Sequence, residues 1–278
     1  DFAEAGTELK VTPYEITKKG KHRAGERLVI GMIPNSEPIE EDFYESHLLR
    51  KMRLILLIFY LRSREKRRTE YSIDYVTLFS ILSEKYKEDL TIIKDDYRRI
   101  VEKIRAGKAH ELSEGDTRYL GACTKGSTAE RSLQPQYYND SIPAKRRAFS
   151  LKQSYMSYLI NHYLLQEAET ADAAFSQEEL ERMDLEAEVI RRIDQYKGKT
   201  EEELCRIFGI ASRSKQTNHL IVSRMLGVKT DNVAEFEKAD IEIKTIRVQK
   251  NGKPKESMSF PVIKIKQFVS EEFEDSRL

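Results

Sequence analysis

The chain has 278 residues, which is enough for one large domain or two small ones, and its formal net charge at pH 7 is only +1. The charge is uneven: residues 1–165 hold 29 Lys/Arg against 24 Asp/Glu, so we expect any phosphate-binding surface mainly in this half. The longest apolar run, residues 54–61, is too short to cross a bilayer, which excludes a helical membrane span.

The expected elements follow from hydrophobic periodicity and from helix start and stop signals. In chain order they are strands over residues 7–17 and 26–33, a short helix over 40–52, a strand over 54–61, a helix over 74–107, a strand over 119–123, a loop over 126–143, a helix over 147–165, an acidic helical connector over 166–199, a helix beginning at 200 and a helix over 211–226. A further element over residues 235–244 and a hairpin turn at Asn251-Gly252 follow.

The first ten residues carry acids and a lysine at a spacing that suits metal-dependent hydrolysis. Residues two apart in a strand point to the same face, so Glu8 and Lys10 share one side of the first expected strand. Asp1 lies across a short turn, from which its carboxylate can reach the same place. Two carboxylates and an ammonium suit a hard divalent cation and one activated water, as in a metal-dependent phosphodiesterase. The alternative is an exposed strand with an ordinary Glu–Lys pair.

The same pattern occurs again near the other end of the chain. Three residues repeat the acid–acid–lysine spacing: Glu235, Glu242 and Lys244. Downstream of the first copy, residues 42–48 recur loosely as residues 272–278. A repeat with a period of roughly 230 residues indicates domain duplication and not a solenoid.

Several short motifs in a fixed order give the chain a family resemblance. They are DFAEAGTELK with TPYE, ERLVI, FYESHLLRK, GKAHELSEG, YLGACTKG, AKRRAFSLKQSYM and, in the second half, KESMSFP. With them the sequence resembles the MutH-type endonucleases, and most closely the duplicated Sau-3A-type restriction enzymes that cut GATC. The resemblance implies an α/β fold (α+β, with a mixed sheet) made of two tandem restriction-endonuclease-like domains of the PD-(D/E)xK, MutH-like type.

The resemblance also implies roles for the first motif. Asp1 and Glu8 match the family's metal-binding acids, and Lys10 matches its catalytic lysine. These acids would hold Mg²⁺ against the scissile phosphate, with the Leu9 carbonyl as a further ligand. Lys51 matches a basic residue that contributes to activity, and we expect it to contact phosphate.

Further residues are expected to contact DNA. His47 stands one helical turn before the matched basic residue, and is either a DNA contact or a polar surface histidine. Lys125 aligns with a family lysine that contacts the GATC site, through either guanine or phosphate. Ser150 and Lys152 lie in FSLK, where the mismatch-repair nicking enzyme has a tyrosine that senses adenine methylation. A serine at that position predicts tolerance of methylated adenine.

The expected organisation has three parts. Residues 1–165 form a catalytic domain that lacks its N-terminal part, residues 166–199 a helical connector, and residues 200–278 the start of a second, DNA-binding or effector domain. The second copy has Ser223 at the family's upstream acidic position and Glu235 in place of aspartate. A decayed second site is therefore expected in preference to a second active centre. Both ends look truncated, and we expect a fragment of a longer protein.

Three functions remain open from the sequence. The leading one is a Mg²⁺-dependent type II restriction endonuclease that cuts double-stranded DNA at GATC, as a monomer that pairs on DNA. The alternatives are a MutH-like nicking enzyme of mismatch repair and a catalytically inactive DNA-binding protein of the same fold. Two widely separated cysteines, Cys123 and Cys205, and the lack of a recognisable signal peptide favour a cytoplasmic protein.

Overall fold

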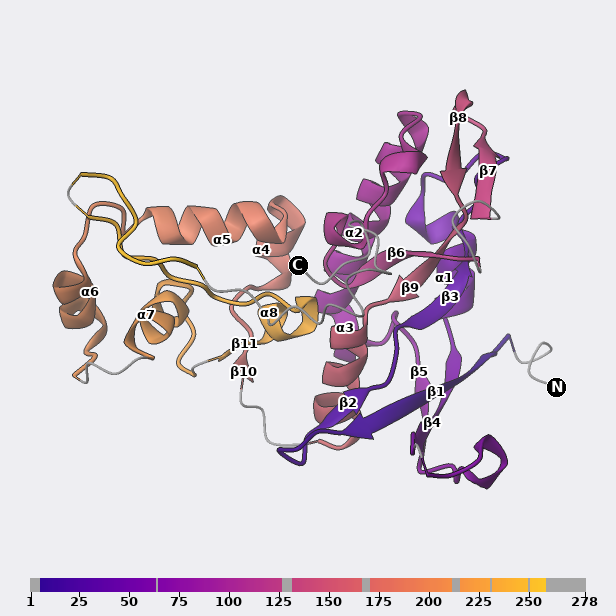
Figure 1. Cartoon of the computed structure of the whole chain (residues 1–278), viewed down its shortest axis with the longest axis horizontal. Helices are drawn as coiled ribbons and strands as arrows, with labels where there is room; N and C mark the ends of the chain where they lie inside the picture. The colour runs from indigo at the N-terminus through magenta and orange to yellow at the C-terminus, as the bar shows by residue number, and fades with distance from the viewer. Residues whose placement is uncertain are drawn as a thin grey trace.

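The computed structural model describes residues 6–63, 65–126, 132–166, 171–211, 216–230, 232–249 and 251–258. Residues 6–166, here called the sheet unit, contain both main sheets and occupy the right side of Figure 1. Residues 171–249, here called the helical unit, lie beside it on the left (Figure 1). Asp1, which was predicted to belong to the site, lies outside the described residues.

The first sheet has four strands in the order β2-β1-β4-β5. They are β1 (Glu8–Ile16), β2 (His22–Ala24), β4 (Ile55–Leu61) and β5 (Tyr75–Phe79). β1 and β4 are parallel, whereas β2 pairs with β1 and β5 pairs with β4 in antiparallel fashion. Alternate residues of β4 enter the core, where Ile55, Leu57 and Phe59 are fully buried. The sheet is mixed, which confirms the fold class expected from the sequence.

The second sheet has three antiparallel strands in the order β3-β9-β6. They are β3 (Leu28–Met32), β6 (Leu120–Thr124) and β9 (Arg147–Leu151). The central strand β9 is buried along its whole length. A separate antiparallel hairpin consists of β7 (Leu133–Gln136) and β8 (Asn139–Lys145).

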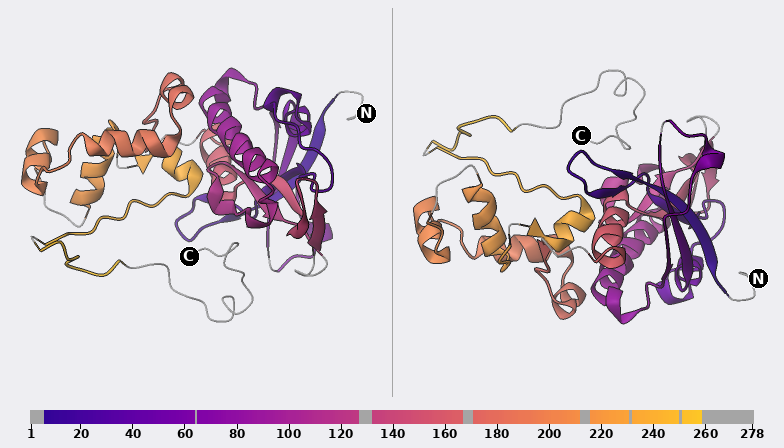
Figure 2. Two further views of the ribbon diagram at one scale, coloured as in Figure 1. Left: turned by 90° about the horizontal axis from the view of Figure 1, so that it is seen from above. Right: turned by 90° about the horizontal axis from the view of Figure 1, so that it is seen from below.

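Helices pack on these strands within the sheet unit. They are α1 (His47–Met52), α2 (Lys87–Arg105), α3 (Gln153–Tyr158) and the π-helical segment Leu159–Leu164. α1 begins at Ser46, whose hydroxyl accepts a hydrogen bond from the Leu49 N–H. One face of α2 is apolar and buried, including Ile93, Tyr97 and Ile100. Helices α2 and α3 lie on the side of the strands that is nearer to the helical unit, whereas α1 lies beside β3 on the other side (Figures 1 and 2).

The helical unit contains five helices and a short strand pair among its described residues. The helices are α4 (Gln177–Arg182), α5 (Leu185–Asp194), α6 (Glu201–Phe208), α7 (Thr217–Met225) and α8 (Ala234–Ala239). The strands β10 (Ala171–Asp172) and β11 (Asn232–Val233) are parallel. Ser176 and Thr200 begin α4 and α6 with capping boxes. The predicted helical connector over residues 166–199 therefore does contain helices.

One apolar core runs through both units. It includes side chains of β4, β9 and α2, and also Phe175, Leu185, Leu226 and Phe236 of the helical unit. Helix α8 packs against α3 and helix α4 packs against α2, and these contacts join the two units. The described core is thus continuous across residue 165, and the division into tandem domains stays a prediction.

Two predicted helices are partly wrong, because a strand occupies the first part of each. Residues 75–79 form strand β5, and helix α2 begins only at Lys87. Tyr75, Leu78 and Ile81 fit a helical spacing, but Tyr75–Phe79 alternates in burial and pairs with β4. Residues 147–151 form strand β9 in place of the first turns of a helix. A central strand buried on both faces has no alternation by which to recognise it.

Two further expectations are corrected. Residues 126–143 contain most of the β7–β8 hairpin instead of a loop, because Tyr137 and Tyr138 turn the chain without a glycine signal. Residues 235–244 do not repeat the first strand: α8 occupies 234–239, and Asp240 ends it at φ +58°.

The expected turn at Asn251-Gly252 is confirmed by the bridge between Val248 and Pro254. In the described part of the chain no helix is both long and apolar enough to cross a membrane.

Candidate active site

Glu8 and Lys10 project from the same face at the start of β1. The Lys10 ammonium lies 2.9 Å from the Glu8 Oε1 atom. The intervening Leu9 side chain points to the other face and is 43% exposed. Strand alternation therefore brings the two polar side chains together, as the sequence predicted, and leaves them partly buried at 28% and 20% exposure.

Lys51 reaches the same carboxylate from α1. Its Nζ atom lies 3.3 Å from Glu8 Oε1, so two ammonium groups share one carboxylate oxygen. His47 belongs to the same helix and lies beside Lys51 near Gly31. Two segments separated by about forty residues thus converge at the first residue of β1.

The two lysines keep Glu8 ionised. Burial on its own would raise the pKa of Glu8, but hydrogen bonds and charge from Lys10, and then from Lys51, lower it below its ordinary value. Burial lowers the pKa of His47, and the charges of Lys51 and Arg50 lower it further against an opposing effect of Glu8. His47 is therefore a neutral hydrogen-bonding group near pH 7 and adds no third positive charge to the cluster.

The described part of the site supplies some of the oxygen ligands that a hard cation such as Mg²⁺ requires. Mg²⁺ binds through one or two carboxylates, with water and substrate phosphate completing its coordination. Glu8 supplies one such carboxylate. Its N–H donates to the Leu54 carbonyl of the neighbouring chain segment, so the alternating backbone of β1 directs the Leu9 carbonyl away from β4. Within the described ranges no group of three or more His, Cys, Asp or Glu side chains is placed so that it could hold a metal ion by itself.

Residues expected to touch DNA occupy different environments. Ser150 is fully buried in β9 and pairs with Gly121, so its hydroxyl cannot reach a base in this structure. The Lys152 ammonium donates to the Thr117 carbonyl at 2.5 Å, and burial lowers its pKa to about 8. Neither side chain is an exposed DNA contact here, because both lie where β9 meets β6.

Two basic residues lie together where β6 ends and β9 begins. The Lys125 N–H donates to the Arg146 carbonyl, which places these two half-buried and exposed side chains next to each other. The adjacent Arg147 is 2% exposed, and its guanidinium donates to the Ala122 carbonyl at 2.7 Å. Within the run Lys145-Arg146-Arg147, Arg146 is therefore an exposed residue and Arg147 a buried structural one, because Arg147 is the first residue of the buried strand β9.

One further site group is a backbone atom. The Lys10 ammonium donates to the Ile30 carbonyl of β3 at 3.4 Å. A glycine inside the apolar run of β3, Gly31, was the sequence signal for an irregular strand at this place.

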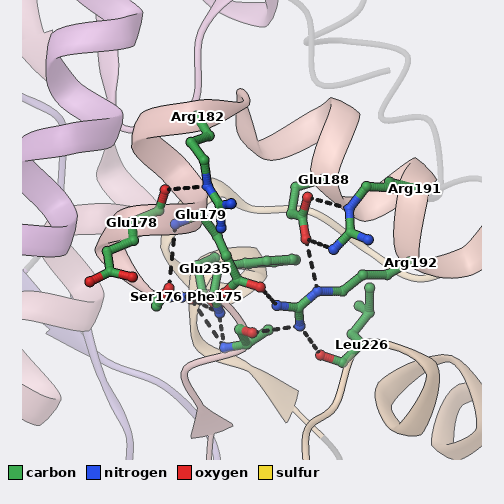
Figure 3. A network of polar contacts seen from close by, with 11 residues as sticks. Phe175, Ser176, Glu178, Glu179, Arg182, Glu188, Arg191, Arg192, Leu226 and Glu235 are labelled. Carbon is green, nitrogen blue, oxygen red and sulfur yellow. Dashed lines mark hydrogen bonds and ion pairs between the residues drawn. The ribbon is translucent and has the colours of Figure 1, made fainter.

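The second acid pattern is not assembled into a comparable site. The buried Glu235 carboxylate accepts hydrogen bonds from the N–H groups of Ala174 and Phe175, within the network of Figure 3. Glu242 and Lys244 form an exposed ion pair at 2.6 Å, at 67% and 41% exposure. The spacing fails here because Glu235 lies in a helix that ends before Glu242. Ser223 is fully buried in α7.

Arg192 completes the same network and explains why Glu235 is structural. Its guanidinium donates to the carbonyls of Ala174 and Leu226 and pairs with Glu179 and Glu188 (Figure 3). The backbone at Ala174 and Phe175 is thus held by Glu235 through its N–H groups and by Arg192 through the Ala174 carbonyl.

Comparison with known proteins agrees with this architecture. The family model described as DNA mismatch repair enzyme MutH matches residues 1–96 and 226–278, which together exceed half of the chain. The chain belongs to the MutH family. Members of the MutH family have a restriction-endonuclease-like fold, in accord with the mixed sheet.

A curated relative extends the comparison along the whole chain. The chain is 38% identical over 286 aligned residues to the type II restriction enzyme Sau3AI of Staphylococcus aureus. The alignment covers 99% of this MutH-family chain and 57% of the relative. The chain therefore spans little more than half the length of that enzyme.

Proposed function

We propose that this chain is the nuclease part of a type II restriction endonuclease that hydrolyses double-stranded DNA at GATC sites with Mg²⁺. The observation that carries the proposal is the convergence of Lys10 and Lys51 on the Glu8 carboxylate. The similarity to a type II restriction enzyme supports the reaction class. The GATC site comes from the resemblance of the sequence motifs.

The residues divide the chemistry between them. Mg²⁺, when bound, supplies positive charge against the phosphate oxygens and acidifies water. Glu8 would hold it together with the Leu9 carbonyl, and with Asp1 as the second predicted acid. Lys10 orients the attacking water and offsets the negative charge that develops on the phosphate. Lys51 contacts the scissile phosphate from the side of α1.

DNA recognition is assigned to the end of β6 and the start of β9. Lys125 and the adjacent Arg146 would contact guanine or phosphate, since both residue types donate to guanine O6 and N7. Ser150 supports tolerance of adenine methylation, because a small enclosed side chain has nothing with which to exclude a methyl group. Residues 200–278 belong, in this proposal, to a second DNA-binding unit that promotes pairing on DNA. Such an enzyme would act on DNA in the cytoplasm.

The test compares plasmid DNA that carries GATC sites in buffers with Mg²⁺, with Ca²⁺ and with EDTA. Double-strand cleavage at GATC in Mg²⁺ alone, on unmethylated and adenine-methylated plasmid, is the expected result. Nicks at GATC would favour a mismatch-repair type of enzyme, and binding without cleavage an inactive DNA-binding protein. Protection by methylation would remove the methyl-tolerance part of the proposal.

A further inference from the structure

Strand β3 contains a bulge beside the candidate site. Val29 pairs with Ser150 and Gly31 pairs with Phe149, so Ile30 is an extra residue opposite two consecutive residues of β9. Such a bulge removes one residue from the regular ladder and bends the strand locally. The Ile30 side chain is 1% exposed and belongs to the core, which fixes the position of its backbone.

The carbonyl of the extra residue faces the site. It accepts a hydrogen bond from the Lys10 ammonium, the same group that contacts Glu8. Lys10 is therefore held between a carboxylate on its own strand and a carbonyl on another sheet. A lysine with two oxygen partners has fewer accessible rotamers than one with a single partner.

Gly31 leaves the space that the α1 side chains fill. A Cβ atom on Gly31 would lie 3.4 Å from Lys51 Cδ and 3.7 Å from both Cε1 and Nδ1 of His47. One methyl group would only touch these atoms, whereas a branched side chain would overlap them. The stem of Lys51 thus passes over a residue that has no side chain.

We infer that the bulge at Ile30–Gly31 positions both lysines of the site. The Ile30 carbonyl holds Lys10 by a hydrogen bond, and Gly31, which has no side chain, leaves room for the stem of Lys51. Both ammonium groups then meet on one oxygen of Glu8. Gly31 is a positioning residue and not a catalytic one, because it acts through Lys51. The inference deepens the proposed function and rests on it for its effect on cleavage.

The test is a graded series at one position. Gly31→Ala should retain single-turnover cleavage within about threefold, and Gly31→Val should lose about 100-fold, the size expected when a reacting group is displaced by an ångström. The atoms that valine would overlap belong to the incompletely buried side chains of Lys51 and His47, which can move aside, so the variant should keep its thermal stability. Gly115→Val is the matched control, since Gly115 has no left-handed φ and a Cβ atom there would meet only the Ser113 hydroxyl, at 3.6 Å.

Coupling to Lys51 distinguishes positioning from general damage. In a Lys51→Ala background the stem is gone, so Gly31→Val should add less than about a threefold further loss. An equal loss in both backgrounds, or full activity of Gly31→Val, would overturn the inference.

A second readout does not depend on cleavage. Gly31→Val should shift the NMR signals of the His47 imidazole, assigned by their loss in His47→Gln, while Gly115→Val leaves them in place. If the wild-type chain cuts no DNA, the proposed function fails, and these shifts still decide the bulge inference. Unchanged His47 signals in Gly31→Val would overturn it.

Discussion

Asp96 is a fully buried carboxylate whose place in the fold is set by backbone donors. It accepts hydrogen bonds from the N–H groups of Arg118, Tyr119 and Leu120, at the entry to β6. Burial raises its pKa to about 6, although these donors and the charge of Lys152 act in the opposite direction. Asp96 therefore fixes the strand that leads to Lys125 at a cost in desolvation.

This environment predicts a particular pH dependence of stability. The folded pKa of about 6 exceeds the ordinary value of 3.8, so the contribution of Asp96 to stability is full below pH 3.8 and is lost as the pH rises through 6. Two units correspond to about 3 kcal/mol in the free energy of unfolding. Urea unfolding of the wild type and of Asp96→Asn from pH 4 to pH 7.5 measures this. The difference, wild type minus variant, should fall with rising pH, and a constant or rising difference would contradict the assignment.

Among the elements, α8 is held to the sheet unit by a buried ion pair. The Lys238 ammonium lies 2.5 Å from Asp89 Oδ1 of α2. The hydroxyls of Tyr155 and Tyr163 donate to Asp89 Oδ2, and the ring of Tyr158 lies 4.8 Å from the ammonium. The Asp89 carboxylate and the Lys238 ammonium are thus each paired with the other and with neighbouring tyrosine side chains.

Removing the lysine should destabilise the whole chain. Lys238→Met leaves the Asp89 carboxylate buried without its cation, which costs about 3–5 kcal/mol. The exposed Lys199→Met serves as the control and should change the free energy of unfolding by less than about 0.5 kcal/mol. Urea midpoints of the two variants give the comparison. Equal midpoints would mean that α8 does not depend on this pair.

Local patterns predicted some elements and failed for others. Glu8 and Lys10 were predictable because strand alternation acts over two residues, and Lys51 because a motif resemblance marked it. Glu235 was not, because whether it lies on a strand or a helix depends on packing against α3. The position of Ser150 was also missed, because the burial of β9 comes from its neighbours β3 and β6.

At the scale of the whole molecule, the two units share one core. Lys238 and Phe236 of α8 enter it from the helical unit, far along the chain from the strands they contact. The spacing of acids in the sequence carried no information about such long-range packing. Glu8 and Lys10 of the first acid pattern therefore lie together as in a site, whereas Glu235 of the second pattern supports the structure.

The proposed hydrolytic site is centred on the Glu8 carboxylate. Single-turnover cleavage of GATC-containing duplex in Mg²⁺ by Glu8→Gln tests it against the wild type. The matched control is Glu15→Gln on the same strand, where Glu15 forms only surface ion pairs with Arg23 and Arg62. We expect Glu8→Gln to cleave at least about 100-fold more slowly while it still binds the duplex, and Glu15→Gln to match the wild type. Equal cleavage by Glu8→Gln and the wild type would contradict the proposed role of Glu8.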